Sequence, residues 1–468
     1  MGNEKVSFFR VFSIFCKKCL TLVRTFAKMP SSAIQNMAKK KTEKETYLTL
    51  VETHIVKKGH PFYDWAMSEC SLSRNLYNRV LYIYRQAFTG KHENIEEYRD
   101  IIKDERFVKK FDVVTRMRAL KDNDFVSMMK VHCAEHIVAQ VDTIWNSWFK
   151  ALKDYKKNPS KYTGRPKMPG YKKGEGVTNI LVYDKSDARI QKDETINISK
   201  KVKLPLNTKI KDLQEVRIIP RIGHIKIEIV YRKDIVDLGL NKDNAIGIDI
   251  GLNNLAAITS NEGSISALIN GRPIKAINQY YNKKKAHYSS ILNKHGLKKS
   301  KRLQKLEQKR HLKIKDYLHK ASRRVVDLMI VNNIGTCVIG HNKGWKQEIG
   351  IGKRNNQNFV QIPFNIFMDM VKYKLKMVGG DFSLNEESHT SKCSAIDNEK
   401  ICHHDEYIGK RTKRGLFVTA NQKYAINDDI NGSLNIIRKG TKKDFNYGNN
   451  IFRPSQIDIE SRTESREG

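Results

Sequence analysis

The sequence has 468 residues, with 87 Lys and Arg against 50 Asp and Glu, a formal net charge of +37 and a hydrophobic content of 39%. This length is enough for several domains. The hydrophobic content excludes a disordered protein, and the lack of a long uninterrupted apolar segment excludes a membrane-spanning helix. So large a positive excess predicts a polyanionic partner, most plainly nucleic acid. Because no long apolar segment is present, we expect no membrane partner.

Residues 1–45 are expected to form a basic N-terminal extension. Apolar residues recur there at helical spacing, but Arg10, Lys17 and Lys18 interrupt the apolar stretch that a signal peptide requires. Seven cysteines in a chain of 468 residues do not form the framework of a disulfide-rich protein. We therefore expect a protein of the prokaryotic cytoplasm, or of another reducing intracellular compartment that contains nucleic acid.

Two kinds of pattern alternate before residue 241. Residues 46–62 begin with the strand pattern YLTLVETHIV, and residues 163–240 contain short alternating runs separated by turn residues. Together these two segments predict a small, wedge-like β-barrel. Residues 63–162 carry apolar side chains at spacings of three and four, which predicts a helical recognition domain inserted into the barrel.

A different organisation begins at residue 241. Three strand patterns, a helical segment at 278–332, and then a strand, a helix, a strand, a loop insert and a final helix follow one another. This order predicts an α/β domain with helices on the faces of a mixed sheet, formed by residues 241–384 and 425–440. Residues 385–424 are the insert, and residues 441–468, which lack periodicity, are expected to form a tail.

The helical segment is strongly basic. Residues 283–324 contain sixteen Lys and Arg but only Glu307 and Asp316 as acids, while their apolar residues keep helical spacing. This pattern predicts a docked helix that lies along a phosphate backbone. Residues 163–174 form a second basic segment, a loop rich in Gly, Pro and Lys. The candidate nucleic-acid contacts are Lys299, Lys301, Arg302, Lys309, Arg310, Lys320 and Arg323, with Arg165 and Lys167 from the loop.

Two carboxylates stand where burial is costly. Asp249 interrupts the apolar strand IGIDIG, between Gly247 and Gly251, and Asp429 begins the helix pattern of NDDINGSLNII. A carboxylate in such a place needs a partner or a metal ion. The alternative is a structural role, as a capping or turn residue for Asp249 and as a helix cap for Asp428 or Asp429.

These two blocks resemble the first and third motifs of the RuvC nuclease domain in the TnpB family of transposon-encoded RNA-guided nucleases, which is related to type V CRISPR effectors. GRPKMPGYKK (164–173) resembles the family's Gly-x-Pro-basic loop, and DYLHKASR (316–323) resembles its helical D-x-x-H-K-x-S-R signature. TSKC (390–393) resembles, one residue short, the start of the family's zinc ribbon. The resemblance covers about residues 47–438.

The resemblance implies a multidomain α+β protein whose RNase H-like (RuvC) domain cuts DNA with two Mg²⁺ ions. It also implies a guide RNA and a double-stranded DNA target as partners, with the protein itself reading only a short flanking motif. It sets no oligomeric state.

One departure from the family concerns the second-motif Glu, because Gly340 stands where that acid is expected. Adjacent strands lie about 4.8 Å apart, so a Glu at the end of the next strand reaches the same pocket. Some members of the family carry this Glu three residues before the Thr-Ser pair, the position that Glu387 occupies here. The resemblance therefore implies that Asp249, Glu387 and Asp429 form the catalytic, metal-binding set, with Glu386 as the fallback for Glu387. The open alternative is a nuclease-inactive RNA-guided DNA-binding regulator.

A second departure lies in the ribbon. Four-thiolate zinc sites use two closely spaced cysteine pairs, whereas Cys393 and Cys402 are nine residues apart and no cysteine follows before Asp429. We expect a degenerate, zinc-ribbon-like insert that does not hold zinc. A transposase that cuts DNA without RNA is disfavoured, because so much basic sequence lies outside the nuclease domain.

Overall fold

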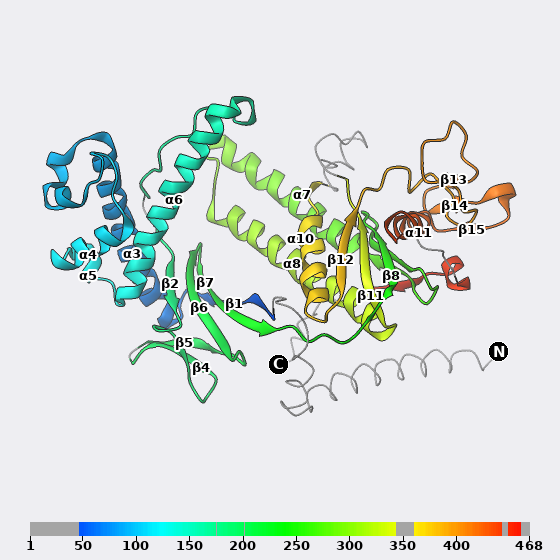
Figure 1. Cartoon of the computed structure of the whole chain (residues 1–468), viewed down its shortest axis with the longest axis horizontal. Coiled ribbons are helices and arrows are strands. Elements are labelled where there is room, and N and C mark those ends of the chain that lie inside the picture. Colours follow the sequence, from blue (N-terminus) through cyan, green and yellow to red (C-terminus); the bar gives the residue numbers. More distant parts are fainter. Residues whose placement is uncertain (1–45, 175, 201, 343–359, 442–447, 460–468) are drawn as a thin grey trace. The chain divides into compact units, whose positions relative to one another are not determined.

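The computed structural model of the chain describes residues 46–174, 176–200, 202–342, 360–441 and 448–459 (Figure 1). The predicted extension at 1–45 and part of the predicted tail lie outside these residues. The chain divides into two compact units, one formed by Thr49–Lys233 and the other containing Asp234 and all that follows. The structure belongs to the mixed α+β, multidomain class predicted from the sequence. Among the described helices, none is long and apolar enough to cross a membrane.

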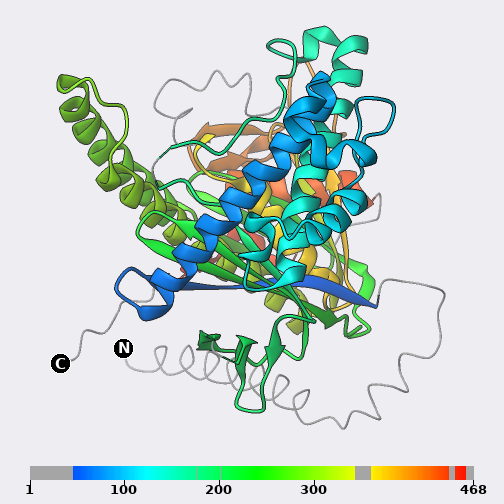
Figure 2. The same ribbon diagram turned by 90° about the vertical axis from the view of Figure 1, so that its left-hand side faces the viewer.

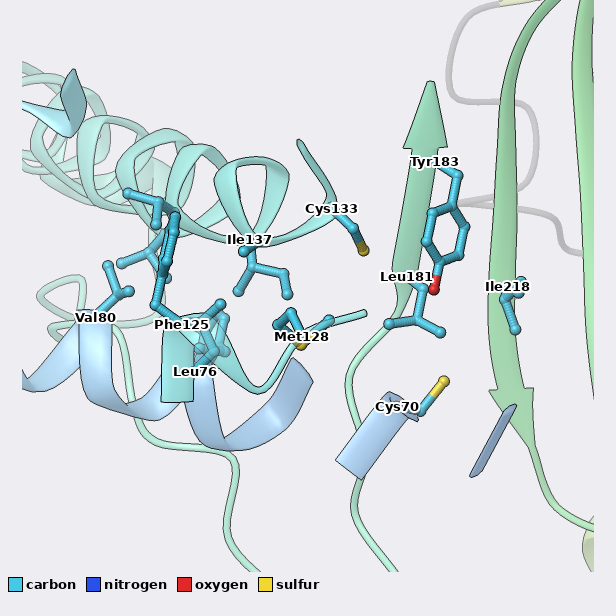
Figure 3. Packing of buried hydrophobic residues seen from close by; sticks show 14 of the residues in the cluster. Cys70, Leu76, Val80, Phe125, Met128, Cys133, Ile137, Leu181, Tyr183 and Ile218 are labelled. Atoms are coloured by element: carbon cyan, nitrogen blue, oxygen red, sulfur yellow. The ribbon is translucent and has the colours of Figure 1, made fainter. Parts of the chain in front are cut away.

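Helices and two sheets form the unit Thr49–Lys233. Its helices are α3 (Pro61–Thr89), η1 (His92–Ile101), α4 (Lys110–Ala119), α5 (Asn123–Val126), α6 (Val131–Lys157) and η2 (Pro159–Lys161). Helix α3 begins at Pro61, where the His60 ring accepts a hydrogen bond from the Phe62 amide, and ends at Gly90 in the left-handed conformation. Figure 3 shows Leu76 and Val80 of α3 packed near Ile137 of α6.

The strands of this unit do not confirm a closed barrel. They are β1 (Tyr47–Lys57), β2 (Leu181–Asp184), β3 (Arg189–Ile190), β4 (Thr195–Ser199), β5 (Val202–Asn207), β6 (Asp212–Arg221) and β7 (His224–Asp234). Four of them form a sheet in the order β1-β7-β6-β2, and β3-β4-β5 form a separate sheet. The alternating patterns identified the strands, but strand pairing decides whether a sheet closes.

The other unit contains a six-stranded sheet in the order β12-β11-β8-β9-β10-β16. Its strands are β8 (Asn241–Asp249), β9 (Asn254–Ser260), β10 (Ser266–Asn270), β11 (Ile334–Gly340), β12 (Asp381–Asn385) and β16 (Ser455–Ile457). Strands β8, β11 and β12 are parallel, whereas β9 runs antiparallel to β8. The carboxyl ends of three strands therefore meet at one edge of the sheet.

Strand β16 corrects the prediction of a tail from residue 441. Residues 449–452 form a 3-10 helix, η4 (Asn449–Phe452), and Ser455–Ile457 pair parallel with Ala267–Ile269 of β10. A three-residue strand is too short to show a period in the sequence. Its place depends on the free edge of β10, which the sequence does not reveal.

The helices of this unit are α7 (Arg272–Lys294), α8 (Lys301–Val331), α10 (Phe364–Lys376) and α11 (Asp428–Thr441). The helical segment predicted at 278–332 is thus two helices, because Gly296 is left-handed and Ser300 caps the start of α8. Helices α7 and α8 pack together and project from the sheet (Figures 1 and 2). Helices α8 and α10 cover one face of the sheet through a shared apolar core, and α11 packs against its other face.

The predicted insert follows β12. It contains a small antiparallel sheet of β13 (Lys410–Lys413), β14 (Leu416–Val418) and β15 (Ala425–Ile426), with η3 (Ala420–Gln422) between the last two strands. This small sheet leads directly into α11, so the insert lies in sequence and in space beside the carboxyl ends of the parallel strands.

Candidate active site

The position of Asp249 follows from the two-residue period of β8. Ile246 and Ile248 are buried in the core shared with α8 and α10, so Gly247 and Asp249 point to the opposite face. A Cβ atom on Gly247 would lie 2.3 Å from the Ser433 carbonyl oxygen, so α11 packs directly on the backbone of β8. The strand therefore presents Asp249 to the start of α11.

The residue before the two leading acids of α11 supplies the N-cap, and Asp428 Oδ1 also accepts a hydrogen bond from the Asp429 amide at 3.0 Å. The Asn427 side-chain oxygen accepts hydrogen bonds from the amides of Asp429 (3.0 Å) and Ile430 (3.3 Å), which is the role of an N-cap. Asp428 is buried and forms an ion pair with Arg411. The Asp429 Oδ2 atom accepts a 2.7 Å hydrogen bond from the Asn254 amide. Asn427 therefore caps the helix, which the sequence analysis left open for the two acids.

Gly432 lies one turn into α11, facing Asp249. A Cβ atom at Gly432 would lie 2.3 Å from Asp249 Oδ2 and 3.2 Å from its Cγ. Only glycine leaves the Asp249 carboxylate in its present place.

Gly340 makes comparable room for Glu387. The register pairs Ile339 with Ile248, so Gly340 follows beside Asp249, and it pairs on its other side with Asn385 of β12. A Cβ atom at Gly340 would lie 2.8 Å from Glu387 Oε2. The Glu387 side chain thus fills the space next to the position where the second-motif acid was expected.

The two candidate glutamates differ in their surroundings. Glu387 is partly buried, its amide donates to Asn342 Oδ1 at 3.1 Å, and Asn342 Nδ2 lies 3.4 Å from its Oε1. Glu386 is exposed and pairs with Lys439, and this hydrogen bond lowers its carboxyl pKa. The structure brings Glu387 to the group of acids and leaves Glu386 on the surface.

Burial and mutual repulsion act on the grouped carboxyls. Burial raises the pKa of Asp249 well above its usual range, and the charges of Asp429, Glu387 and Asp428 raise it further. Burial also raises the pKa values of Glu387 and Asp429, although the hydrogen bond from Asn254 opposes this rise at Asp429. Clustered acids with raised pKa values are stabilised by a cation.

A pocket of about 500 Å³ opens onto Asp249, Asp428 and Asp429. Its lining combines acids from the sheet edge and α11 with basic and aromatic residues from the insert: Asp249, Ser391, Lys392, Tyr407, Gly409, Lys410, Arg411, Phe417, Asp428 and Asp429. The sequence analysis missed Lys392, Lys410 and Arg411. The basic run GKRTKR at 409–414 was the available signal.

The predicted acids do not form one compact ligand cage. Within the described part of the chain, only His132, Asp184 and Asp187 place three metal-ligand atoms all within 4.8 Å of one another. Asp249, Glu387 and Asp429 are therefore more widely spaced.

The two cysteines of the predicted degenerate ribbon have different partners. The Cys393 thiol lies 3.5 Å from the Lys400 carbonyl, and the Cys402 sulfur lies 3.4 Å from His404 Nε2.

The predicted nucleic-acid contacts fall into two groups. One group is exposed on or beside α8: Lys299, Lys301, Arg302 and Lys309. Arg165 and Lys167, which belong to the unit Thr49–Lys233, are exposed as well. The remaining three form hydrogen bonds or ion pairs within the protein, whereas Arg302 of the first group lies over the Tyr288 ring, 4.7 Å from its centroid. Arg310 donates to Asn278 Oδ1 (2.7 Å) and to the Gln361 carbonyl (3.0 Å), while Lys320 and Arg323 pair with acids one turn away on α8.

Two family models match the chain. The model described as "Probable transposase" (OrfB_IS605) matches residues 230–346, and the model described as "Cas12f1-like, TNB domain" matches residues 364–436. The resemblance to TnpB-type proteins and their CRISPR relatives, predicted from the motifs, is confirmed by these matches. None of the curated proteins matches the sequence.

Several solved structures are similar at low identity. A Cas12f1–sgRNA–target DNA complex has 16% identity and a TM-score of 0.43, with 78% of this chain and 81% of that chain covered. The mini RNA-guided endonuclease CRISPR-Cas_phi3 has 11% identity and a TM-score of 0.42, with 93% and 98% covered. C2c1 of Alicyclobacillus acidoterrestris in complex with single-guide RNA has 7% identity and a TM-score of 0.35, with 82% and 70% covered. Similarity at this level does not establish an activity.

Proposed function

We propose that this chain is an RNA-guided DNA endonuclease whose RuvC site hydrolyses phosphodiester bonds next to a short flanking motif. The observation that carries the proposal is that Asp249 and Asp429 line one basic-rimmed pocket. Glu387, from a third segment, lies near enough to Asp249 for its charge to raise the pKa of that acid. Acids gathered in this way are costly for the fold alone. The matches to a probable transposase and to a Cas12f1-like domain support the same reading.

The donor set fits divalent cations of the Mg²⁺ type. All three proposed ligands are carboxylates, which Mg²⁺ prefers, and Gly340 and Gly432 leave the space that Glu387 and Asp249 occupy. Two such ions about 3.5–4 Å apart are the arrangement that we propose for these carboxylates. When bound, such ions supply a nucleophilic water at neutral pH and neutralise the charge on the leaving oxygen.

The residues around these acids have separable tasks in the proposed reaction. Asn254 orients the Asp429 carboxylate, and Asn342 holds Glu387. Lys392 and Lys410 at the pocket lining would bind phosphate groups of the substrate strand. Arg411 already neutralises Asp428, so that this acid does not add its full charge to the group.

We further propose that the nucleic acids are held outside this pocket by exposed basic residues. In the unit that contains the acids these are Lys299, Lys301, Arg302 and Lys309. In the other unit, which we propose contains the helical recognition domain and wedge-like strands, Arg165 and Lys167 have the same role. Base pairing by a bound guide RNA would then choose the DNA sequence.

The deciding experiment combines co-purified RNA with cleavage. The protein is isolated from its native host, the bound RNA is sequenced, and cleavage of DNA complementary to that RNA is measured with Mg²⁺. We expect a specific RNA species, cleavage by the wild type and by Glu386→Gln, and no cleavage by Glu387→Gln. Absence of a specific RNA would refute guidance. If the wild type binds RNA and its DNA target but cuts no DNA, the chain is the nuclease-inactive regulator. Full activity in both variants refutes the relocated acid.

A further inference from the structure

A second group of metal-ligand side chains lies at the start of α6, in the unit Thr49–Lys233. His132 and His136 are one helical turn apart on α6, while Asp184 ends β2 and Asp187 lies in the turn that follows. Ligand atoms of His132, Asp184 and Asp187 all lie within 4.8 Å of one another. His136 is outside this group of three, but its Nε2 lies 3.7 Å from Asp184 Oδ2, so a movement of its partly exposed side chain would add a fourth ligand.

The backbone elements that carry these side chains are fixed by packing. Cys133, next to His132, is buried with its sulfur toward β2, beside Leu181 and Tyr183 (Figure 3). In the turn after β2, Asp184 Oδ1 accepts the amides of Ser186 (2.8 Å) and Asp187 (3.3 Å). The other oxygen of Asp184 is therefore left to face His136.

Asp187 has an unsatisfied oxygen in this group. Its side chain is only 6% exposed, and its Oδ1 lies 3.1 Å from His132 Nδ1. Its Oδ2 is buried and has no hydrogen-bond partner. A buried carboxylate oxygen without a partner is costly, and a cation held by the neighbouring ligands would remove that cost.

We propose that His132, His136, Asp184 and Asp187 bind one divalent transition-metal ion of the Zn²⁺ class, which links α6 to the turn after β2. In a tetrahedral Zn²⁺ site the metal–ligand bonds are about 2.0–2.2 Å, so neighbouring ligand atoms lie about 3.3–3.5 Å apart. The His132–Asp187 separation of 3.1 Å and the His136–Asp184 separation of 3.7 Å are close to this value. The ligand atoms of His132, Asp184 and Asp187 all lie within 4.8 Å of one another, so metal binding would draw the group together. Two imidazoles select Zn²⁺ over Mg²⁺, which prefers oxygen ligands. The site is separate from the carboxylate pocket and has a different metal preference.

The test uses the full-length protein after treatment with EDTA and dialysis. Co²⁺ is titrated as a spectroscopic probe, and Zn²⁺ affinity is measured by competition. We expect one equivalent of Co²⁺ with visible d–d bands and without the strong near-ultraviolet absorption that thiolate ligands cause. Zn²⁺ should also raise the melting temperature of the wild type. His136→Gln should weaken binding at least about 100-fold, since even outer-shell partners of a metal site contribute about 10–100-fold.

Two further variants make the result specific. Asp187→Asn should abolish the d–d bands of bound Co²⁺. Because His136 is partly exposed, its replacement should not prevent folding, so His136→Gln keeps the test valid if Asp187→Asn does not fold. His54→Gln is the matched control, because His54 also contacts a carboxylate, Glu52 at 2.5 Å, but belongs to no such group. Wild-type binding in His136→Gln and Asp187→Asn would overturn the proposal, and so would a thiolate spectrum that persists in both.

Discussion

Gly432→Ala is the sharpest perturbation of the proposed nuclease site, because it adds one methyl group and removes no ligand. The added Cβ atom would lie 2.3 Å from Asp249 Oδ2, whereas ordinary contacts begin at 3.4 Å. The Asp249 carboxylate or the first turns of α11 must therefore move by about 1 Å. Alanine is favoured over glycine inside a helix by about 0.5–1 kcal/mol, so α11 itself is not weakened by the change.

A displacement of this size has a predictable effect on the reaction. Misplacing a reacting group by about 1 Å costs about 100-fold in rate, which corresponds to about 2.7 kcal/mol in the barrier. Binding of RNA and DNA should be unchanged, because Gly432 faces the acid and not the exposed basic residues. The measurement is the single-turnover rate of DNA cleavage by the complex of the protein with its co-purified RNA, together with target affinity in Ca²⁺.

Gly440→Ala provides a control in the same helix. Its Cβ atom would lie 2.7 Å from Val338 Cγ1. This contact is also closer than an ordinary one, but it is made with an apolar side chain and not with an acid. This variant should lose about 1–3 kcal/mol of stability through overpacking, and should cleave at the wild-type rate below its melting temperature. Wild-type cleavage by Gly432→Ala would refute the assignment of Asp249 as a positioned ligand, and equal losses in both variants would point to general damage.

Three other outcomes follow from the charges. Asp249→Asn removes a buried carboxyl that lies among other acids. At pH 7 it should raise the unfolding free energy of the metal-free protein by on the order of 1 kcal/mol, which corresponds to a melting temperature about 2–4 °C higher in EDTA. The variant should also be stabilised less by Mg²⁺. The folded-state pKa values of Asp249, Asp429 and Glu387 are raised, so their contribution to stability is complete below the unfolded-state pKa of about 4 and is lost as the pH rises through the folded-state values. Metal-free wild type should therefore lose stability relative to Asp249→Asn as the pH rises above about 4, and identical pH profiles would contradict this. Lys309→Ala should lower nucleic-acid affinity and reduce the slope of log affinity against log salt concentration by about 1. Arg310→Ala should mainly lower the melting temperature, because Arg310 forms hydrogen bonds within the protein. The opposite pattern would show that Arg310 is the phosphate contact.

Local sequence patterns determined most elements of the fold. The apolar run around Asp249 predicted β8, and the pattern NDDINGSLNII predicted α11. Both signals arise within one element, where the period of the side chains reports the face that is buried. The boundary between α7 and α8 was missed, although Gly296, which is left-handed, and Ser300, which caps α8, were signals for it in the sequence.

The site itself was predicted in part. The sequence placed Asp249 and Asp429 at the ends of elements, and family resemblance suggested the relocated Glu. Only the pairing of β11 with β8 and β12 put Gly340 beside Asp249 and gave Glu387 the adjacent space. The pairing register of strands depends on contacts between segments far apart in the chain, which no local period reports.

The sequence by itself determined the charge of the protein, the helices and strands, and the acids at their ends, because these follow from composition and from short-range periodicity. The tertiary structure decided which charges act together. It turned Arg310 inward to Asn278, placed β16 beside β10, and gathered His132 with Asp184 and Asp187 from segments about fifty residues apart. Each of these depends on which faces meet when separate elements pack, and packing is a property of the whole fold.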